Sequence, residues 1–285
     1  MPEAAPVNQS PIRRVLTLPL RGLAFLGARL LNTLDLIGAS WFLLLGAAGW
    51  VLRSVHNRKV RVGRPAIITQ MVRIGVRSVF IVSLVSGCVG LILALQMAPP
   101  LDDFGQKDKV ANIVSVAVLR ELGPLIGAIV LTGFAGASIA AEIGTMVVSE
   151  EIEALESLAL DPVRFLVVPR VIASIVSMTV LAVIADIVAI AAAMWIAMAA
   201  LDVPGNTFWT NMLAQAKLVD FWTGVSKGTV FGLLIGVIAC INGLRVKGGA
   251  AGVGLATTNT VVQCVVAIVM ADLAFTAVFF ALKLV

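Results

Sequence analysis

Six charged side chains lie in the interior of long apolar runs of this sequence, where a membrane would surround them. They are Arg120, Glu121, Glu142, Asp186, Lys227 and Asp272. A charge at the centre of a membrane helix costs about 2.5–3.5 kcal/mol on insertion scales, so such residues are usually paired or functional. Glu121 and Lys227 have opposite charges and predict an ion pair between two helices. With Arg120 they could also line a polar patch in a transport cavity, and the two roles are compatible.

The sequence offers few parts for enzymatic chemistry. His56 is its only histidine, so a histidine-rich metal centre or a Ser-His triad lacks its members. Cys88, Cys240 and Cys264 all lie in apolar runs, without disulfide or metal-ligand spacing. The motif G-x-x-x-x-G-K-[ST] of a P-loop does not occur. We therefore expect no catalytic residue, metal or cofactor in this chain, and any ATP that drives it would bind another subunit.

A short acidic segment separates two of the apolar runs. Its carboxylates are Glu150, Glu151, Glu153, Glu156 and Asp161. Apolar residues recur every three positions, at Ile152, Leu155 and Leu158, and predict an amphipathic helix over 149–161. Ser149 is expected to cap its start, and Asp161-Pro162 to end it, because the residue before proline avoids helical geometry. A two-faced helix between two spans lies at a membrane surface, where it either docks a partner or is a solvated connection.

The elements that position these groups are membrane helices. The chain has 285 residues, of which 60% are hydrophobic and 13% charged, and its mean hydropathy is +1.04. A soluble domain could not hide so many continuous apolar runs, so the expected fold class is all-α and polytopic. The positive charges gather at the ends of the runs without an aromatic-interleaved patch, which argues against nucleic acid as a partner.

About five membrane helices are expected in residues 71–285, which we treat as one transmembrane domain. They cover Ile74–Met97, Val110–Val148, Phe165–Ala200, Phe221–Leu244 and Thr258–Leu282. Pro99-Pro100 is expected to end the first helix. The second is too long for one straight crossing and contains Gly123-Pro124, which predicts a break or kink with unwound backbone beside Arg120 and Glu121.

Glycines at helical spacing mark two of these runs. They are Gly123 and Gly127 in the second run, and Gly228, Gly232 and Gly236 in the fourth. Small residues four apart let membrane helices approach closely, so we expect tight packing at both places.

Residues 1–70 are expected to form an N-terminal tail followed by membrane-surface helices. Arginines alternate with leucines over Pro11–Leu34, which suits a helix that lies on the membrane. The segment Ile37–Val55 is about long enough to span, but both its flanks are basic. Because positive residues collect on the cytoplasmic side, we favour a segment that dips into or lies along the inner leaflet over one that crosses it.

Loop charges indicate the orientation of the spans. The loops 101–109 and 201–220 each hold one more acidic than basic residue and suit the outside, whereas the 245–254 loop carries Arg245 and Lys247 and suits the inside. The N-terminus is therefore expected in the cytoplasm. The acidic segment 149–161 then also lies inside, and a basic cytoplasmic partner would account for its charge.

Four stretches of the sequence follow the order and spacing of one known family. They are RELGP at 120–124, AAEIGTM at 140–146, EEIEALESLALDPVRFLVVPR at 150–170 and GLRVKGGAAGVGLATTNTVV at 243–262. The sequence resembles MlaE/YrbE-type permeases, the membrane subunits of bacterial ABC lipid transporters that work with MCE-domain proteins. The likeness runs from about residue 70 to the C-terminus. It implies a permease of the bacterial inner membrane that transfers lipid, with phospholipid as the favoured class, between that membrane and an MCE-domain partner.

The resemblance also implies roles for single residues. Glu150–Leu160 would be the coupling helix that seats in a groove of a cytoplasmic ATPase, and that ATPase would bind ATP and magnesium. Two permeases, identical or homologous, would pair around an apolar lipid pocket near the outer side. Candidates to line the pocket are Leu93, Leu95 and Gln96. Polar positions of the family's cavity match Arg120, Glu121 and Lys227. The lipid class and the direction of transport stay open.

Two other classes of function remain. An ion- or proton-coupled secondary transporter could use Glu121, Asp186 and Asp272 as a relay, but no inverted repeat is visible and the acidic helix would be unexplained. An intramembrane enzyme would need a convergent nucleophile and base or a metal set, which one histidine and scattered acids do not supply.

Overall fold

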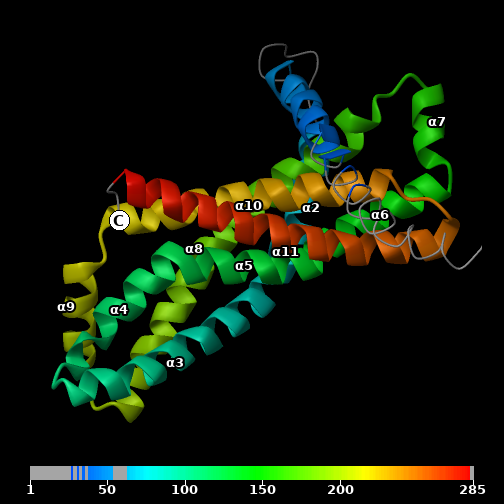
Figure 1. The fold of residues 1–285 in the computed structure, drawn as a ribbon. Helices are drawn as coiled ribbons and strands as arrows, with labels where there is room; N and C mark the ends of the chain where they lie inside the picture. The colour runs from blue at the N-terminus through cyan, green and yellow to red at the C-terminus, as the bar shows by residue number, and fades with distance from the viewer. Residues whose placement is uncertain (1–26, 28–30, 32–33, 36–37, 54–62, 283–285) are drawn as a thin grey trace, which may run out of the picture. The chain divides into compact units, whose positions relative to one another are not determined.

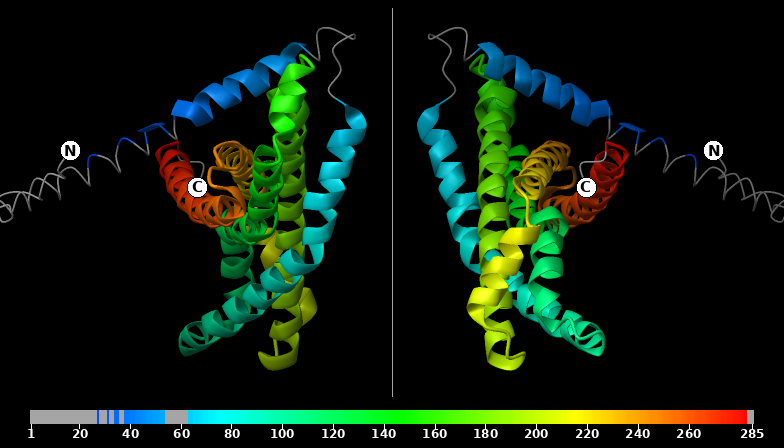
Figure 2. Two further views of the ribbon diagram at one scale, coloured as in Figure 1. Left: turned by 90° about the vertical axis from the view of Figure 1, so that its right-hand side faces the viewer. Right: turned by 90° about the vertical axis from the view of Figure 1, so that its left-hand side faces the viewer.

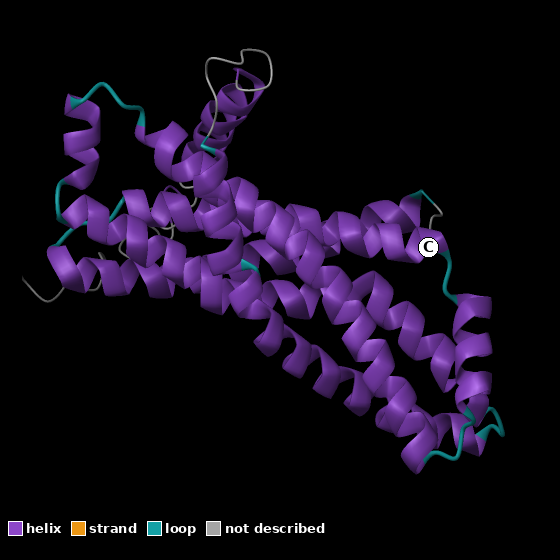
Figure 3. Cartoon of the chain, turned by 180° about the vertical axis from the view of Figure 1, so that it is seen from behind, coloured by secondary structure: helices purple, strands orange, loops and turns teal. Residues whose placement is uncertain are grey.

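The computed structural model describes residues 27, 31, 34–35, 38–53 and 63–282. All regular structure in these ranges is helical, as Figure 3 shows. The chain divides into two compact units, Met1–Leu45 and Gly46–Val285, and each is considered by itself. The surface helix expected over Pro11–Leu34 falls almost wholly outside the described residues. A short apolar helix covers Gly38–Arg53, close to the expected segment Ile37–Val55. Whether this helix dips into the membrane stays a prediction.

Five helical runs are long and apolar enough to cross a membrane. They are Pro65–Asp103, Lys107–Val148, Val163–Ala200, Leu218–Leu244 and Gly249–Ala281. Each overlaps one expected span, which confirms the all-α membrane fold. The α-helices within and between the runs are α2 (Arg64–Ile74), α3 (Val79–Asp103), α4 (Val110–Ala117), α5 (Gly123–Leu131), α6 (Ala137–Val148), α7 (Glu151–Ser157), α8 (Val168–Ala200), α9 (Gly205–Gln215), α10 (Leu218–Leu244) and α11 (Gly249–Ala281).

The first run differs from expectation at both ends. It begins with α2, about three turns before the expected start, and a 3-10 turn over Val76–Ser78 joins α2 to α3. The prediction that Pro99-Pro100 ends this helix is wrong, because α3 continues through both prolines to Asp103. A proline removes the hydrogen bond to the carbonyl four residues back and its ring crowds that carbonyl, here the carbonyls of Leu95 and Gln96. Both of these residues are exposed, so the loss does not disturb the packed face of α3.

The second run bends without unwinding. The backbone stays helical from α4 to α6, but it widens into π-helix over Val118–Leu122 and again over Thr132–Gly136. Gly123 donates its N–H to the carbonyl of Val118, five residues back. The extra residue in this turn accommodates Pro124, which has no N–H to donate. Figure 1 shows α4 and α5 running in different directions on either side of the first π-segment. The expected kink is confirmed, and the expected unwound backbone is not found.

The expected outer loop 201–220 contains a further helix, α9, which the sequence analysis did not predict. Phe208 and Met212 of α9 are buried in an apolar cluster with residues of α3, α4 and α8, among them Ala94, Val114 and Ala193. This cluster holds the ends of three spans together at the end of the bundle opposite α7 (Figure 1).

Close helix contacts depend on the glycines, as predicted. Helix α10 packs against both α8 and α11 (Figure 2). A Cβ atom on Gly228 would lie 3.0 Å from the Cβ of Ala182, and one on Gly232 would lie 2.6 Å from the carbonyl oxygen of Ser174. The glycine face of α10 therefore seats directly on the backbone of α8.

Candidate functional site

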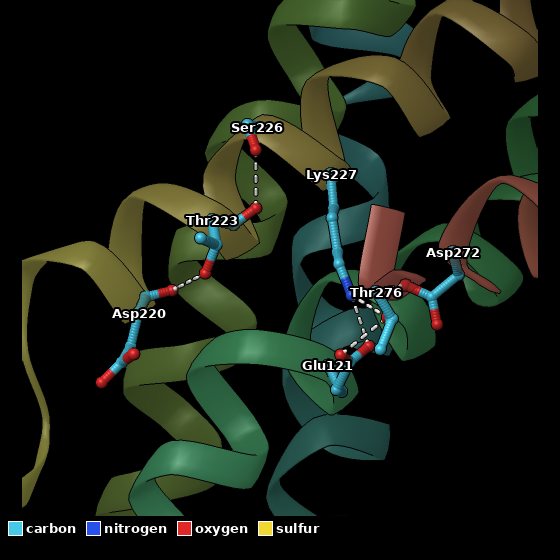
Figure 4. Close-up of polar contacts among 7 residues, drawn as sticks. All are labelled: Glu121, Asp220, Thr223, Ser226, Lys227, Asp272 and Thr276. Atoms are coloured by element: carbon cyan, nitrogen blue, oxygen red, sulfur yellow. Dashed lines mark hydrogen bonds and ion pairs between the residues drawn. The ribbon is translucent and has the colours of Figure 1, made fainter. Parts of the chain in front are cut away.

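Lys227 is the centre of a polar cluster between three spans. It lies in the middle of α10 and its side chain is 1% exposed. Its Nζ atom is 2.5 Å from Oε2 of Glu121 and 2.9 Å from Oδ1 of Asp272. Lys227 also donates a hydrogen bond of 3.0 Å to Thr276, which in turn donates to Oε1 of Glu121 at 3.0 Å. Figure 4 shows these four side chains converging from α10, α11 and the π-segment Val118–Leu122. The predicted ion pair of Glu121 and Lys227 is confirmed.

The cluster is buried on one side and open on the other. Lys227 lies on the buried side, whereas the Glu121 side chain is 37% exposed and Thr276 is exposed. One cation faces two carboxylates, so the cluster presents excess acceptor capacity at its open side. It can therefore fix three helices together and also offer a polar surface within the spans.

Asp272 and Thr276 lie one turn apart on the same face of α11, a spacing that the sequence already contains. The sequence analysis did not assign Thr276, because a threonine inside an apolar run is common and has no signal of its own.

A close approach between α10 and the first π-segment sets the position of Lys227. Because Pro124 has no N–H, the carbonyl of Leu119 lacks its π-helical donor. This carbonyl points at Gly224 of α10, at the place where any Cβ would stand. The absence of a side chain at Gly224 lets α10 approach the bulge, which brings Lys227, one turn later, against Glu121.

Arg120 belongs to a separate ion pair. Its Nε atom is 2.7 Å from Oδ1 of Asp220, whose side chain is 2% exposed. The other oxygen of Asp220 accepts the backbone N–H of Lys217, at the start of α10. Neighbouring residues of the π-segment thus contact different parts of α10, and Figure 4 shows Asp220 well apart from Lys227. Asp220 was missed because it was counted in a loop, although an acid in the first turn of a helix is a recognisable signal.

Asp186 does not join the other carboxylates in a relay. It is buried on α8, where its Oδ1 atom packs against Gly123, and its oxygens accept no hydrogen bond from any described residue. Glu121 and Asp272 share Lys227 instead. The structure therefore brings together two members of the relay that the secondary-transporter hypothesis requires and leaves out the third.

The predicted acidic helix is α7, and it is shorter than the predicted range. Glu150, Glu151, Glu153 and Glu156 are all exposed, while Ile152 and Leu155 are half-buried. Leu158, predicted on the apolar stripe, follows the helix and is 70% exposed. Helix α7 packs against α6.

The predicted ends of α7 are both wrong. Ser149 does not cap the helix: its hydroxyl donates to the carbonyl of Thr145 and to Glu151, and Glu150 is the first flanking residue, with φ 58°. The helix ends at Ser157, because Ala159 adopts φ 58° before the proline is reached. Asp161 instead starts the next span, since it accepts the backbone N–H of Val163 at 2.8 Å and the indole N–H of Trp50 at 2.9 Å.

Comparison with known proteins identifies the family. The family model described as Permease MlaE matches residues 67–278. This chain belongs to the MlaE permease family. It is 37% identical over 214 residues to a probable ABC transporter permease protein of Rickettsia prowazekii, which covers 75% of this chain and 83% of that protein.

Two further relatives cover more of the chain. A probable ABC transporter permease protein of Synechocystis is 34% identical over 81% of this chain and 89% of its own length. The intermembrane phospholipid transport system permease protein MlaE of Haemophilus influenzae is 30% identical over 90% of this chain and 96% of its own length. The resemblance found in the sequence motifs is thereby confirmed.

The three candidate pocket residues of this MlaE-family permease point to different sides of α3. Leu93 is half-buried and packs against the apolar cluster around Phe208. Leu95 is 44% exposed and Gln96 is also exposed. Their role in lipid binding stays a prediction.

An arginine–glutamate cluster stands near the other end of the first span. Oε1 of Glu142 is 2.9 Å from Arg73 and 3.1 Å from Arg170. Arg170 is buried on α8 and also donates to the carbonyl of Leu166. The sequence analysis listed Glu142 among the charges in spans but did not assign Arg73 to it, because that arginine was counted outside the first span.

Proposed function

We propose that this chain is the permease subunit of an ABC-type lipid transporter, with a separate ATPase docked on α7. In this proposal the ATPase binds ATP and magnesium on the cytoplasmic side of a bacterial inner membrane, and the permease has its N-terminus in the cytoplasm. A second permease copy and an extracytoplasmic MCE-domain protein complete the path. The substrate is a phospholipid. The names of the Rickettsia and Haemophilus relatives support the ABC and phospholipid parts of the proposal.

The observation that carries the proposal is the exposed acidic face of α7. Three exposed glutamates, Glu151, Glu153 and Glu156, lie on the seven-residue helix between α6 and α8, and exposed Glu150 directly precedes it. An acidic surface complements a basic docking cleft and steers its association. Asp161, which follows α7, accepts hydrogen bonds from Val163 and Trp50. A movement of α7 would therefore be transmitted to the start of the membrane run Val163–Ala200.

In this proposal the lipid path lies in the half of the spans that is farther from α7. Burial of acyl chains would supply most of the binding free energy, about 0.8 kcal/mol per methylene. Leu95 and Gln96 would face the lipid, and their carbonyls, which the prolines leave without α-helical donors, add polar groups there. The open side of the Lys227 cluster would orient or tolerate the headgroup.

A charge reversal on α7 tests the docking. The variant Glu153→Lys plus Glu156→Lys should lose the ATPase on copurification, because two exposed acids become two cations opposite a basic cleft. The matched control is Asp102→Lys plus Asp103→Lys, which reverses the charge of two exposed acids at the C-terminal end of α3, far from α7. Retained assembly in the first variant, or equal loss in both, would contradict the proposal. Flux driven by a pH gradient without any ATPase would instead favour the secondary transporter.

A further inference from the structure

A lateral groove on the first span combines an apolar floor with an arginine rim. A cavity of about 290 Å³ lies between the α2–α3 bend and α8. Its lining is Ile68, Met71, Val72, Gly75, Val76 and Val79 from the first run, and Val176, Ser177, Val180 and Leu181 from α8. Ser177 is the only lining residue with a polar side-chain group besides the methionine sulfur. Apolar side chains such as Val76 and Val180 are exposed in it, at 64% and 52%.

The groove exists because the first membrane helix bends there. The 3-10 turn over Val76–Ser78 interrupts the helix, and Gly75 sits so close to α8 that a Cβ atom would lie 2.7 Å from the hydroxyl of Ser177. A 3-10 turn within a long helix changes the direction of its side chains. Both α2 and α3 pack against α8, and the bend between them leaves apolar side chains such as Val76 and Val180 exposed.

Two arginines border the groove. A second cavity, of about 520 Å³, is lined by Ile68, Thr69, Val72, Arg73 and Arg77, and it shares Ile68 and Val72 with the apolar groove. A third, of about 100 Å³, continues from Arg73 and Arg77 to Gln70, Ser138 and Glu142. The apolar and polar parts therefore form one continuous surface feature.

The arginines stand at the height of lipid headgroups. No charged residue occurs from Ser78 to Leu101, a stretch that at about 1.5 Å per residue matches the hydrocarbon core of a bilayer. Arg77 and Arg73 thus mark one boundary of the core, and Asp102 marks the other. The groove residue Val180 lies ten positions into α8 from Arg170, on the hydrocarbon side of that boundary.

The charge balance at the rim favours an anion. Arg73 and Arg170 both contact Glu142, whereas Arg77 has no ion-pair partner among the described residues and is exposed. The single carboxylate of the rim is thus already shared by two cations. A phosphate would satisfy the guanidinium of Arg77, while the ammonium group of a zwitterionic lipid would find no free acid beside it.

We propose that this groove binds an anionic phospholipid of the surrounding leaflet, with its phosphate on Arg77 and Arg73 and one acyl chain along Val79 and Val180. Basic pockets between membrane helices are suited to such headgroups. The site is formed by residues of a single chain, and its lining includes neither Leu95 nor Gln96. It needs only the membrane location of the spans and does not rest on the docking of an ATPase at α7.

Lipid retention tests the proposal. The full-length protein, with whatever subunits copurify, is reconstituted in phosphatidylcholine bilayers that contain a minor fraction of phosphatidylglycerol. Bound lipids are then counted by native mass spectrometry. The wild-type chain should retain phosphatidylglycerol in preference to phosphatidylcholine. Arg77→Gln should reduce that preference about five-fold, the factor that one arginine is worth near an anionic headgroup. Lys247→Gln removes an exposed cation at the same end of the spans and should leave the preference unchanged.

A second pair of variants tests the acyl-chain part. Val180→Phe should fill the groove and lower the retention of lipid, whereas Ile187→Phe, two turns along the exposed face of α8, should not. Added inorganic phosphate should not displace the lipid, because a free phosphate gains nothing from the apolar floor. The proposal is overturned if wild type shows no preference, if either variant matches its control, or if phosphate competes. Glu153→Lys plus Glu156→Lys should keep the lipid even if it loses the ATPase, so the two proposals fail separately.

Discussion

The carboxylates of Glu121 and Asp272 lie within the spans and both contact Lys227. The four glutamates at positions 150, 151, 153 and 156, on and just before α7, are instead exposed to solvent. The first group is held by an opposite charge and by Thr276 from a neighbouring helix. The side chains of the second group are exposed to solvent instead. A charge within the membrane core must find a partner inside the protein, while a charge at the surface is free to meet a partner from outside. The two regions therefore predict opposite responses to mutation.

The largest effect on stability is expected at Lys227. Lys227→Met leaves Glu121 and Asp272 side by side without their cation, which should lower the free energy of unfolding by about 3–5 kcal/mol. Thermal unfolding of the purified protein in detergent measures the loss.

Neutralising the acids provides the control for this prediction. The triple variant Lys227→Met, Glu121→Gln and Asp272→Asn should recover most of the stability, because no buried charge remains. A Lys227→Met protein as stable as wild type would show that the cluster does not hold the three helices.

A somewhat smaller loss is expected where α10 meets the first π-segment. Gly224→Val places a side chain on the carbonyl of Leu119 and should cost about 1–3 kcal/mol, because α10 must move away. The same unfolding measurement applies. Gly254→Ala is the matched control, since a Cβ atom at Gly254 meets no atom within 4 Å. Equal stability of the two variants would contradict the close approach that positions Lys227.

The smallest effect on stability is expected on α7. Glu153→Gln plus Glu156→Gln should change the free energy of unfolding by no more than about 0.5 kcal/mol, because both side chains are exposed. The same variant should bind the ATPase more weakly, since two acids of the docking face are neutralised. Unfolding and copurification are measured on one preparation. If the variant were markedly destabilised but still copurified with the ATPase as wild type does, these glutamates would have a structural role. The contrast between α7 and the Lys227 cluster would then be wrong.

The sequence predicted most of the membrane architecture and half of the central cluster. Continuous apolar runs are recognisable in a sequence, so each of the five helical runs overlaps one predicted span, although the bounds of the first run were wrong at both ends. The pair of Glu121 and Lys227 followed from the cost of isolated charges in a membrane. The error at Pro99-Pro100 arose because a proline's effect depends on which carbonyls it frees, and those of Leu95 and Gln96 lie on an exposed part of α3.

Other contacts were not predicted because at least one partner in each was counted in a loop or outside the five spans. Arg120 finds Asp220 one hundred positions away, and Asp161 finds Trp50. The roles of Arg73 and Arg77 at the lateral groove depend on a bend in the first helix and on its contact with α8. The glycine spacing indicated one closely packed face of α10, but it did not indicate which helix would meet that face.

The sequence by itself determined that this chain is a bundle of membrane helices, because hydrophobicity and length are properties of each segment alone. It also determined that the charges within the spans need partners and that α7 is acidic. Only the tertiary structure decided which partners those are. The reason is geometric: the π-segment before Pro124 and the bare backbone of Gly224 set the rotation and distance of α10, and these place Lys227 between Glu121 and Asp272.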